Sequence, residues 1–438
     1  LVDGTTEYAI SDGNVLFADG PTNTVLSEGT LELVGATTNL VLQAHNSITI
    51  NDLTDNVLNL QQNSGHSATF LTDANGTFTM NAGDTIQTAG GSLTIDTGNI
   101  QTLGTLSVGV GTVTLTEHGA TGVTLPTINA ATLNVTSGGD ITLPSTSTLT
   151  ITNGIALTSD KAVTINASIS APSATFVVHA NNDATGAGGT YTQANNVTVA
   201  VGAMTLTADG LNLGTNATIT VNADSSIAPA KATDSIGIEF AAGIDFNLTQ
   251  AQLDAIISGS HVLTIGNASH SGGITIGQDM LVNAGSKNLA FLTASNIAVG
   301  AFGLTTTGSL GLTADNGGNT ALISAGGGGG TLTAGSFLLI ADAGIGISGT
   351  HLKLSGASTL AASTGSGGVF ISYTGAPTLQ TISGTSNAAG STGYTLNATG
   401  LVTVSTGGIT TGSGGTVDLN TAPSAGNVTL AAGTSINA

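Results

Sequence analysis

One short phrase recurs along the chain, a threonine-rich strand followed by a turn of Gly, Asn or Asp. It occurs at residues 93–100 (LTIDTGNI), 133–141 (LNVTSGGDI) and 428–436 (VTLAAGTSI). Alternation of apolar residues with Thr, Asn or Ser over a few positions is typical of half-buried β-strands. An internal repeat indicates that each strand stacks on its counterpart. We therefore expect a long, repetitive surface rather than a single deep pocket.

The spacing of these strands predicts the fold class. Strand starts recur about every 15–20 residues, often with a second short strand between them. Short strands with little helix between them predict an all-β, right-handed parallel β-helix, which is a β-solenoid. A sandwich of two sheets would need longer paired strands and a more aromatic core than a chain with 3% aromatic residues can provide. The strands lie at 39–42, 77–80, 112–115, 148–151, 162–165, 204–207 and 218–221.

One segment interrupts the strand pattern and predicts a short helix near 249–258. Thr249 and Gln252 form a capping box at its start, and Gly259 suits its end. Leu248 and Leu253 can pack against each other across the first turn. We expect no other helix in the chain.

The predicted organisation has three parts. Residues 1–235 are degenerate solenoid repeats, 236–262 are an insertion that contains the helix, and 263–438 are repeats that continue to an uncapped end. The glycine-rich stretches 184–190 and 325–331 are expected to be loops between coils, with a linker between independent domains as the alternative.

Composition excludes several classes of function. Charged residues make up 7% of the chain, against about 25% in typical soluble proteins. Four Lys+Arg against 25 Asp+Glu give a net charge of −21, so there is no basic stripe for nucleic acid or for an anionic membrane. The chain has no Cys, which excludes thiol chemistry and disulfides. No apolar run is long enough for a transmembrane helix, and no signal peptide is evident. Because the sequence starts within repeats and without Met, we expect it to be a processed or excised part of a longer protein.

A carbohydrate-binding or carbohydrate-cleaving β-helix is the alternative function, and the charged residues argue against it. Cleavage of acidic sugars needs carboxylates and cationic groups on one face of the coil. The only cations are Lys161, Lys231, Lys287 and Lys353. The acids stand at turns, where Asp is a common turn former. Examples are Asp84, Asp96, Asp140, Asp209 and Asp224. We therefore predict no catalytic residues and no enzyme activity.

Metal and cofactor sites are not predicted either. The histidines show no spacing of a zinc site, and Glu117-His118 is only an adjacent pair. Asp73-Ala74-Asn75-Gly76 starts like a calcium loop but lacks the further acids, so surface calcium is a weak alternative. The remaining histidines are expected to be corner or surface residues. They are His45, His66, His179, His261, His270 and His351.

Ice binding by a flat threonine face is a third hypothesis, with candidate strands at 148–150 and 218–220. Such a face needs one register through many coils, and the unequal spacing of the repeats argues against it. Asn-x-Ser/Thr sequences could accept glycans in an exported protein, although a chain rich in Asn and Thr contains them by chance. They start at Asn134, Asn166, Asn216, Asn267 and Asn397.

The region around the predicted helix resembles filamentous-haemagglutinin-like giant surface proteins. The phrases are 246–256 (FNLTQAQLDAI) with Gly259, 263–266 (LTIG) and 272–276 (GGITI), and then 343–347 (AGIGI), 352–354 (LKL) and 359–364 (TLAAST). The phrases at 40–48 and 428–436 are similar to the commonest repeat of that family. The resemblance covers 236–375 as specific phrases and most of the chain as repeat style. The family's N-terminal secretion domain is not evident.

This resemblance implies a right-handed parallel β-helix, export by a two-partner or related route, and a role in adhesion or extracellular fibres. It brings no catalytic residues. We therefore expect an extracellular, cell-surface structural protein that forms a β-helical rod or fibre segment. Its ends are expected to continue into more repeats or to stack on other copies, and a host-cell or polysaccharide surface is a further expected partner.

Overall fold

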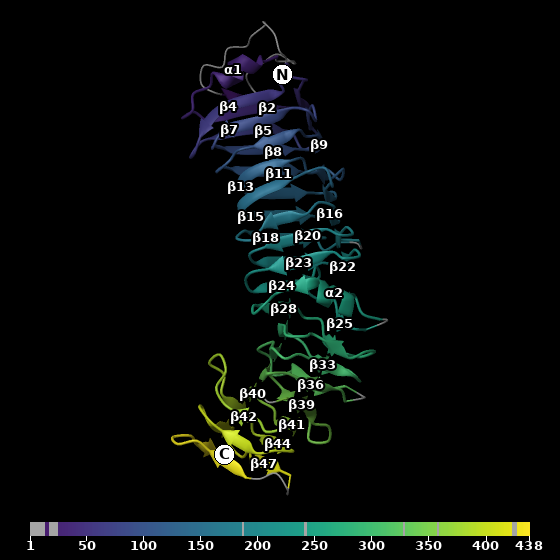
Figure 1. The fold of residues 1–438 in the computed structure, drawn as a ribbon, viewed down its shortest axis with the longest axis vertical. Helices are drawn as coiled ribbons and strands as arrows, with labels where there is room; N and C mark the ends of the chain where they lie inside the picture. Colours follow the sequence, from purple (N-terminus) through teal and green to yellow (C-terminus); the bar gives the residue numbers. More distant parts are fainter. Residues whose placement is uncertain are drawn as a thin grey trace. The chain divides into compact units, whose positions relative to one another are not determined.

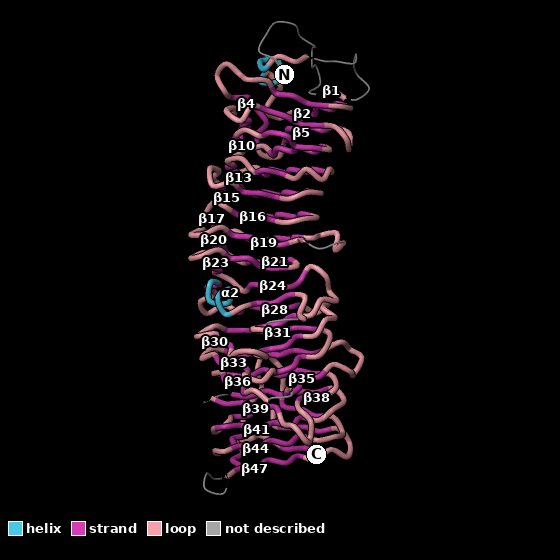
Figure 2. The backbone as a smooth tube through the Cα atoms, turned by 90° about the vertical axis from the view of Figure 1, so that its right-hand side faces the viewer, coloured by secondary structure: helices cyan, strands magenta, loops and turns pink. Residues whose placement is uncertain are grey.

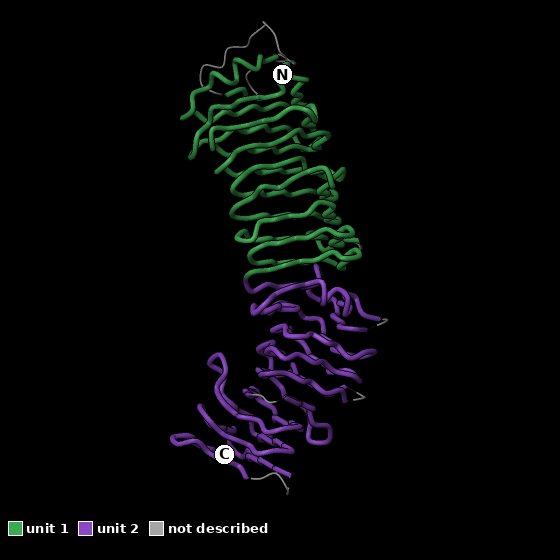
Figure 3. The backbone as a smooth tube through the Cα atoms, viewed as in Figure 1, with its two compact units in different colours: residues 1–222 green, residues 223–438 purple. Residues whose placement is uncertain are grey.

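The computed structural model describes residues 14–16, 25–185, 188–240, 243–326, 329–356, 359–422 and 427–438. They form two compact units, unit 1 (1–222) and unit 2 (223–438), shown in Figure 3. The chain is all-β, with parallel strands stacked as a β-solenoid of about 18 turns. This confirms the predicted all-β parallel β-solenoid.

Unit 1 is built from parallel ladders of strands (Figure 1). Its main ladder is β1 (Asn14–Val15), β2 (Leu40–Ala44), β5 (Ser67–Thr72), β8 (Ser92–Thr97), β11 (Thr112–Glu117), β13 (Ile128–Ser137), β15 (Leu149–Ser159), β18 (Thr175–Ala180) and β21 (Met204–Ala208). A second ladder is β4 (Val57–Asn63), β7 (Thr85–Ala89) and β10 (Thr105–Ser107), and β10 also pairs with β13. A third is β3 (Ser47–Ile50), β6 (Thr77–Met80) and β9 (Asn99–Thr102), and a fourth is β17 (Ile169–Ala171), β20 (Thr198–Val201) and β23 (Thr218–Val221). The fifth is β12 (Val123–Thr124), β14 (Ile141–Leu143), β16 (Val163–Ile165), β19 (Thr190–Gln193) and β22 (Gly210–Leu213).

Unit 2 follows the same plan. Its main ladder is β24 (Ser225–Pro229), β28 (Val262–Gly266), β31 (Asn288–Thr293), β34 (Ser309–Ala314), β37 (Ser336–Ala341) and β40 (Thr359–Thr364). Strand β40 pairs with two strands, so the ladder divides there. One branch is β42 (Thr378–Leu379), β45 (Val402–Val404) and β48 (Val428–Leu430), and the other is β43 (Asn387–Ala389), β46 (Ile409–Thr411) and β49 (Ile436–Asn437). A second ladder is β26 (Phe246–Leu248), β25 (Ile236–Ile238), β29 (Ile274–Ile276), β32 (Ile297–Val299), β35 (Leu322–Ala325), β38 (Gly344–Ile345), β41 (Val369–Thr374), β44 (Tyr394–Ala398) and β47 (Val417–Thr421). A third ladder is β30 (Val282–Asn283), β33 (Gly303–Thr305), β36 (Thr331–Thr333) and β39 (Leu352–Ser355), and β39 pairs with β41.

Strand β8 shows why the repeated phrase folds in this way. Successive side chains of a strand point to opposite faces. Leu93, Ile95 and Thr97 are therefore buried in the coil, whereas Thr94 and Asp96 point outward. Thr and β-branched residues favour this extended backbone because their χ1 angle is restricted.

Inward residues stack in register from coil to coil although the repeats differ in length. Leu93 pairs with Val113, and Leu133 pairs with Ile155, at similar separations in the sequence. Phe176 pairs with Met204 at a larger separation. The turns absorb the difference. Several of them turn on Asn in the left-handed region, where its short polar side chain is tolerated. These include Asn56, Asn181, Asn196 and Asn216.

The predicted helix is present as α2 (Gln250–Ala255), one of two short helices in the described residues (Figure 2). Thr249 is its N-cap, and the capping box with Gln252 is formed. The expected end is wrong, because the helix stops at Ala255 and the chain enters β27 (Ile256–Ile257). Gly259 lies instead in a later turn, with φ +55°.

A second helix, α1 (Glu28–Glu32), was not expected. Ser27 caps it by accepting a hydrogen bond from the Thr30 N–H at 3.3 Å, and Leu31 is fully buried. This helix is hard to predict from the sequence, because it is short and contains Gly29, and glycine disfavours helix interiors.

The two glycine-rich stretches connect successive strands, as predicted for loops. The first joins β18 to β19 and the second joins β35 to β36. Residues 186–187 and 327–328 within them lie outside the described residues. The boundary between the compact units falls after Asn222, not in either stretch. The segment predicted as an insertion, 236–262, supplies β25 and β26, which pair with each other.

Candidate functional site

Polar side chains at the ends of unit 1 strands form a buried column, which we call the polar column. It consists of the last residues of β5, β8, β11, β13 and β15, namely Thr72, Thr97, Glu117, Ser137 and Ser159. The strand register places Glu117 between Thr97 and Ser137, and Ser137 beside Ser159. All five residues are buried, so the column is an interior feature of the coil stack.

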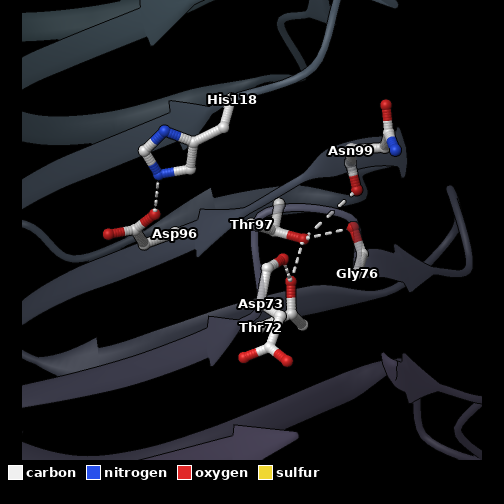
Figure 4. Close-up of polar contacts among 7 residues, drawn as sticks. All are labelled: Thr72, Asp73, Gly76, Asp96, Thr97, Asn99 and His118. Atoms are coloured by element: carbon white, nitrogen blue, oxygen red, sulfur yellow. Dashed lines mark hydrogen bonds and ion pairs between the residues drawn. The ribbon is translucent and has the colours of Figure 1, made fainter. Parts of the chain in front are cut away.

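Figure 4 shows the first two members of the column. The hydroxyl oxygens of Thr72 and Thr97 lie 2.6 Å apart. The Thr97 hydroxyl donates to the Gly76 carbonyl at 3.1 Å, in the turn of the preceding coil. The column thus holds successive turns together, because buried polar groups must find partners in neighbouring coils.

Glu117 is the ionisable member of the column. Its carboxylate accepts hydrogen bonds from the Ser137 hydroxyl at 2.8 Å and from the Thr121 hydroxyl at 3.1 Å. It is only 1% exposed, which leaves no path for a substrate to reach it. Ser159 continues the pattern by donating to the Gly139 carbonyl at 2.7 Å. Glu117 therefore serves as a hydrogen-bond acceptor in the core.

Three histidines pair with aspartates from neighbouring coils, which the sequence did not reveal. The His118 Nε2 atom lies 2.7 Å from an Asp96 carboxylate oxygen (Figure 4), and the His45 Nδ1 atom lies 2.9 Å from Asp73. In unit 2 a longer pair of 3.9 Å joins His261 to Asp224. Every partner is at least one-third exposed, so water and ions screen these pairs. Only the coil register brings these residues together, because they are far apart in the chain.

The other aspartates singled out in the sequence bind backbone amides. Asp140 accepts from the Ala162 N–H at 3.0 Å and Asp224 from the Val262 N–H at 2.9 Å. Asp209 accepts from the Gly189 N–H and Asp84 from the Leu53 N–H, each at 3.2 Å. This is the structural role expected of turn-forming aspartates. Among the described residues, no three His, Asp or Glu side chains lie close enough to hold a metal ion.

The short Asp73-Ala74-Asn75-Gly76 sequence forms a tight turn, with the Gly76 N–H donating to the Asp73 carbonyl at 2.7 Å. The lysines are dispersed, with Lys161 in unit 1 and the other three in unit 2. Lys353 lies on β39, and its ammonium group sits over Gly329. Among the described residues, the ion pairs of the aspartates named above are with histidines rather than with these lysines.

His270 is the most deeply buried histidine. Its side chain is fully inaccessible, and neither ring nitrogen has a hydrogen-bond partner among the described residues. Burial lowers the pKa of His270 below its ordinary value of 6.5, because the charged ring would lose its hydration. The ring is therefore neutral in the folded chain near neutral pH. The sequence had suggested a corner or surface residue, and the structure corrects this.

Unit 1 carries a shallow recess of about 330 Å³. It is lined by Ala82, Ile100, Gln101, Thr102, Leu103, Thr124, Leu125, Pro126, Pro144 and Ser147. None of these side chains is ionisable, so the recess lacks the carboxylates and histidines that most often act as general acids and bases.

A comparison of the chain with protein-family models, with curated proteins and with solved structures finds no match. In the part of the chain that the structure describes, neither helix has the length and apolarity needed to cross a membrane.

Proposed function

We propose that the chain is a structural segment of an extracellular surface protein, which forms part of a rod or fibre for adhesion or filament assembly and performs no catalysis. The observation that carries this proposal is the continuous stacking of the coils. Parallel backbone pairing runs from strand to strand within each unit, and the inward side chains form unbroken apolar rows.

The physical effect of this arrangement is stiffness. Each repeat cannot bury its apolar face alone, so neighbouring coils stabilise one another through their interface. Residues such as Leu115 and Leu312 are fully buried between coils. Burial of a Leu side chain contributes about 1.5–3 kcal/mol relative to its exposure. A chain that devotes nearly all its strands to such contacts is suited to bear load and to resist proteolysis.

The polar groups support a structural role over an enzymatic one. The buried carboxylate of Glu117 has no access to solvent, and the aspartates at the turns bind backbone amides. A carbohydrate-cleaving β-helix would need paired carboxylates facing an open groove. The recess in unit 1 has no carboxylate in its lining.

The last coil suggests a self-associating surface. Val404 is fully buried, yet its partner in the next coil, Leu430, is 46% exposed. Strand β48, which contains Leu430, pairs among the described strands only with β45. An exposed apolar strand edge of this kind can pair with a further strand. We propose that another copy of the chain covers this strand.

Sedimentation velocity of the whole chain over a range of concentrations tests association at this edge. We expect concentration-dependent association that Leu430→Asp weakens. Thr429→Asp is the matched control, because Thr429 is an exposed residue of the same strand, and it should associate like the wild type. Equal behaviour of the two variants would contradict the proposed edge contact.

Incubation with a panel of neutral and acidic polysaccharides tests the absence of catalysis. We expect no new reducing ends and no shortening of the polymers. Release of oligosaccharides that survives repurification would overturn the structural proposal and favour a carbohydrate-active β-helix.

A further inference from the structure

The outward residues of β5, β8, β11 and β13 form a regular array, which we call the threonine face. Its middle row runs through Thr69, Thr94, Thr114 and Asn134, each paired with the next. The flanking rows contain Ser67 beside Ser92, Thr112 beside Thr132, and Leu71, Asp96, Thr116 and Thr136 in sequence. Figure 1 shows the four strands stacked in this order.

This array corrects the sequence-based objection to a repeated face. The chain spacing between repeats varies, but the turns absorb the variation and the strands keep one register. Thr94, for example, pairs with Thr114 although other repeats are longer. The candidate strands chosen from the sequence, at 148–150 and 218–220, do not belong to the array.

Most hydroxyl groups of this face have no partner among the described residues; the Ser92 hydroxyl is an exception, since it accepts a hydrogen bond from the Thr112 N–H at 3.2 Å. Among the described residues, the hydroxyls of Thr94, Thr114 and Thr116 form no hydrogen bond to another protein group, and the same holds for Thr69, Thr132 and Thr136. Inward threonines differ, since Thr97 and Thr293 donate to carbonyls of neighbouring turns. The face thus presents donors and acceptors that only an external partner can satisfy.

The geometry of the face is fixed in two directions. Neighbouring strands lie about 4.8 Å apart, and alternate residues of one strand lie about 6.7 Å apart. These two distances are close to the spacings between oxygen atoms on faces of hexagonal ice. Thr has a restricted χ1 angle, and the backbone ladders hold its Cα in place, so little side-chain entropy remains to be lost on binding.

The chemistry of the face also fits an uncharged lattice. Asp96 is the only ionisable side chain on the four strands' outward positions, and it lies in a flanking row where it bonds to His118. The face has no aromatic ring, which a flat polysaccharide surface would use for stacking. Each threonine instead offers a methyl group and a hydroxyl to ordered water.

We propose that the threonine face binds the surface of ice. Adsorption comes from many weak contacts made in register, with each hydroxyl taking the place of a water at the crystal surface. This property is independent of the proposed structural role, since it depends on outward residues alone.

Partition of the whole chain into a slowly growing ice crystal, together with thermal hysteresis, tests the proposal. We expect the wild type to be enriched in the ice fraction and to depress the freezing point below the melting point. Thr114→Tyr places a large ring at the centre of the array and should abolish both effects. Ser170→Tyr on β17 is the matched control, because Ser170 is an outward hydroxyl residue between buried neighbours, belongs to another sheet and pairs with Ala200 rather than with a threonine. It should behave like the wild type.

Two results would overturn the proposal. One is exclusion of the wild-type chain from ice to the same degree as a protein without affinity for ice. The other is equal loss of activity in the two variants. Circular dichroism melting curves of both variants establish that each is folded, so that a loss in Thr114→Tyr reports on the face itself.

Discussion

The main ladders of unit 1 and unit 2 carry similar residues inward but different residues outward. In unit 1, Val113 and Leu115 are fully buried on β11, and in unit 2, Leu310 and Leu312 are fully buried on β34. The outward middle row is Thr94, Thr114 and Asn134 in unit 1. In unit 2 the corresponding row is Ala290, Gly311 and Leu338.

This difference separates what the fold requires from what it leaves free. The coil needs apolar residues that stack inward, because they supply most of the burial. It places little demand on the outward positions, where a hydroxyl, a methyl or a hydrogen is accepted. A functional surface can therefore arise on one unit without a change of fold.

The largest predicted effect concerns the inward rows. Leu115→Ala in unit 1 and Leu312→Ala in unit 2 should each reduce the free energy of unfolding by about 2–5 kcal/mol, since each leaves a cavity in a packed core. Urea unfolding followed by circular dichroism measures both. A substantial loss in only one unit would show that the two inner rows are not equivalent.

Both units have buried threonines at the ends of main-ladder strands, such as Thr97 and Thr293, and they differ in the ionisable residue. Unit 1 has Glu117 at the end of β11, whereas unit 2 has the buried Ala314 at the end of β34. Glu117→Ala should cost about 1–3 kcal/mol, because the buried hydroxyl of Ser137 loses its acceptor. Glu117→Gln, which keeps one carbonyl oxygen, should cost less. An unchanged urea midpoint in Glu117→Ala would contradict this account of the column.

The burial of His270 in unit 2 predicts that the free energy of unfolding depends on pH. The pKa of His270 is lowered by burial, so below pH 6.5 the unfolded chain binds a proton that the folded chain does not. This contribution to stability is complete above pH 6.5 and is lost as the pH falls toward the folded pKa. His270→Leu should make the urea midpoint less sensitive to pH in that window. An unchanged slope would show that the ring is not the group responsible.

The smallest predicted effect is on the outward row of unit 2. Ala290→Thr introduces the residue type found on the threonine face, and it should change the free energy of unfolding by no more than about 0.5 kcal/mol. Thermal melting of the variant beside the wild type measures this. A large destabilisation would mean that outward positions in unit 2 are more constrained than those in unit 1.

The strands were predictable because their alternation follows directly from the two faces of a solenoid coil. The phrase at 93–100 covers all of β8 except Ser92, and its apolar residues are the inward ones, as expected. The start of α2 was also predictable, because Thr249 and Gln252 form a local capping box. Its end was not, since Ile256 leaves the helix to enter a strand and no residue nearby marks the change.

The candidate site features depend on contacts between coils, which no local pattern encodes. His118 and Asp96 are separated by a whole coil, and the burial of His270 follows from the packing of its turn. The threonine face was missed for the same reason. Unequal repeat lengths suggest lost register, whereas the structure keeps the register and places the extra residues in turns.

Strand β8 allows the most direct test of the distinction between inward and outward positions, because it contains a threonine on each side. Thr97 is buried and donates to the Gly76 carbonyl, whereas the Thr94 hydroxyl points outward. The measurement is the free energy of unfolding in urea of Thr97→Val and Thr94→Val, two changes that keep the side-chain shape. We predict a loss of about 1–3 kcal/mol for Thr97→Val and a change within about 0.5 kcal/mol for Thr94→Val. Equal losses in the two variants would contradict the account.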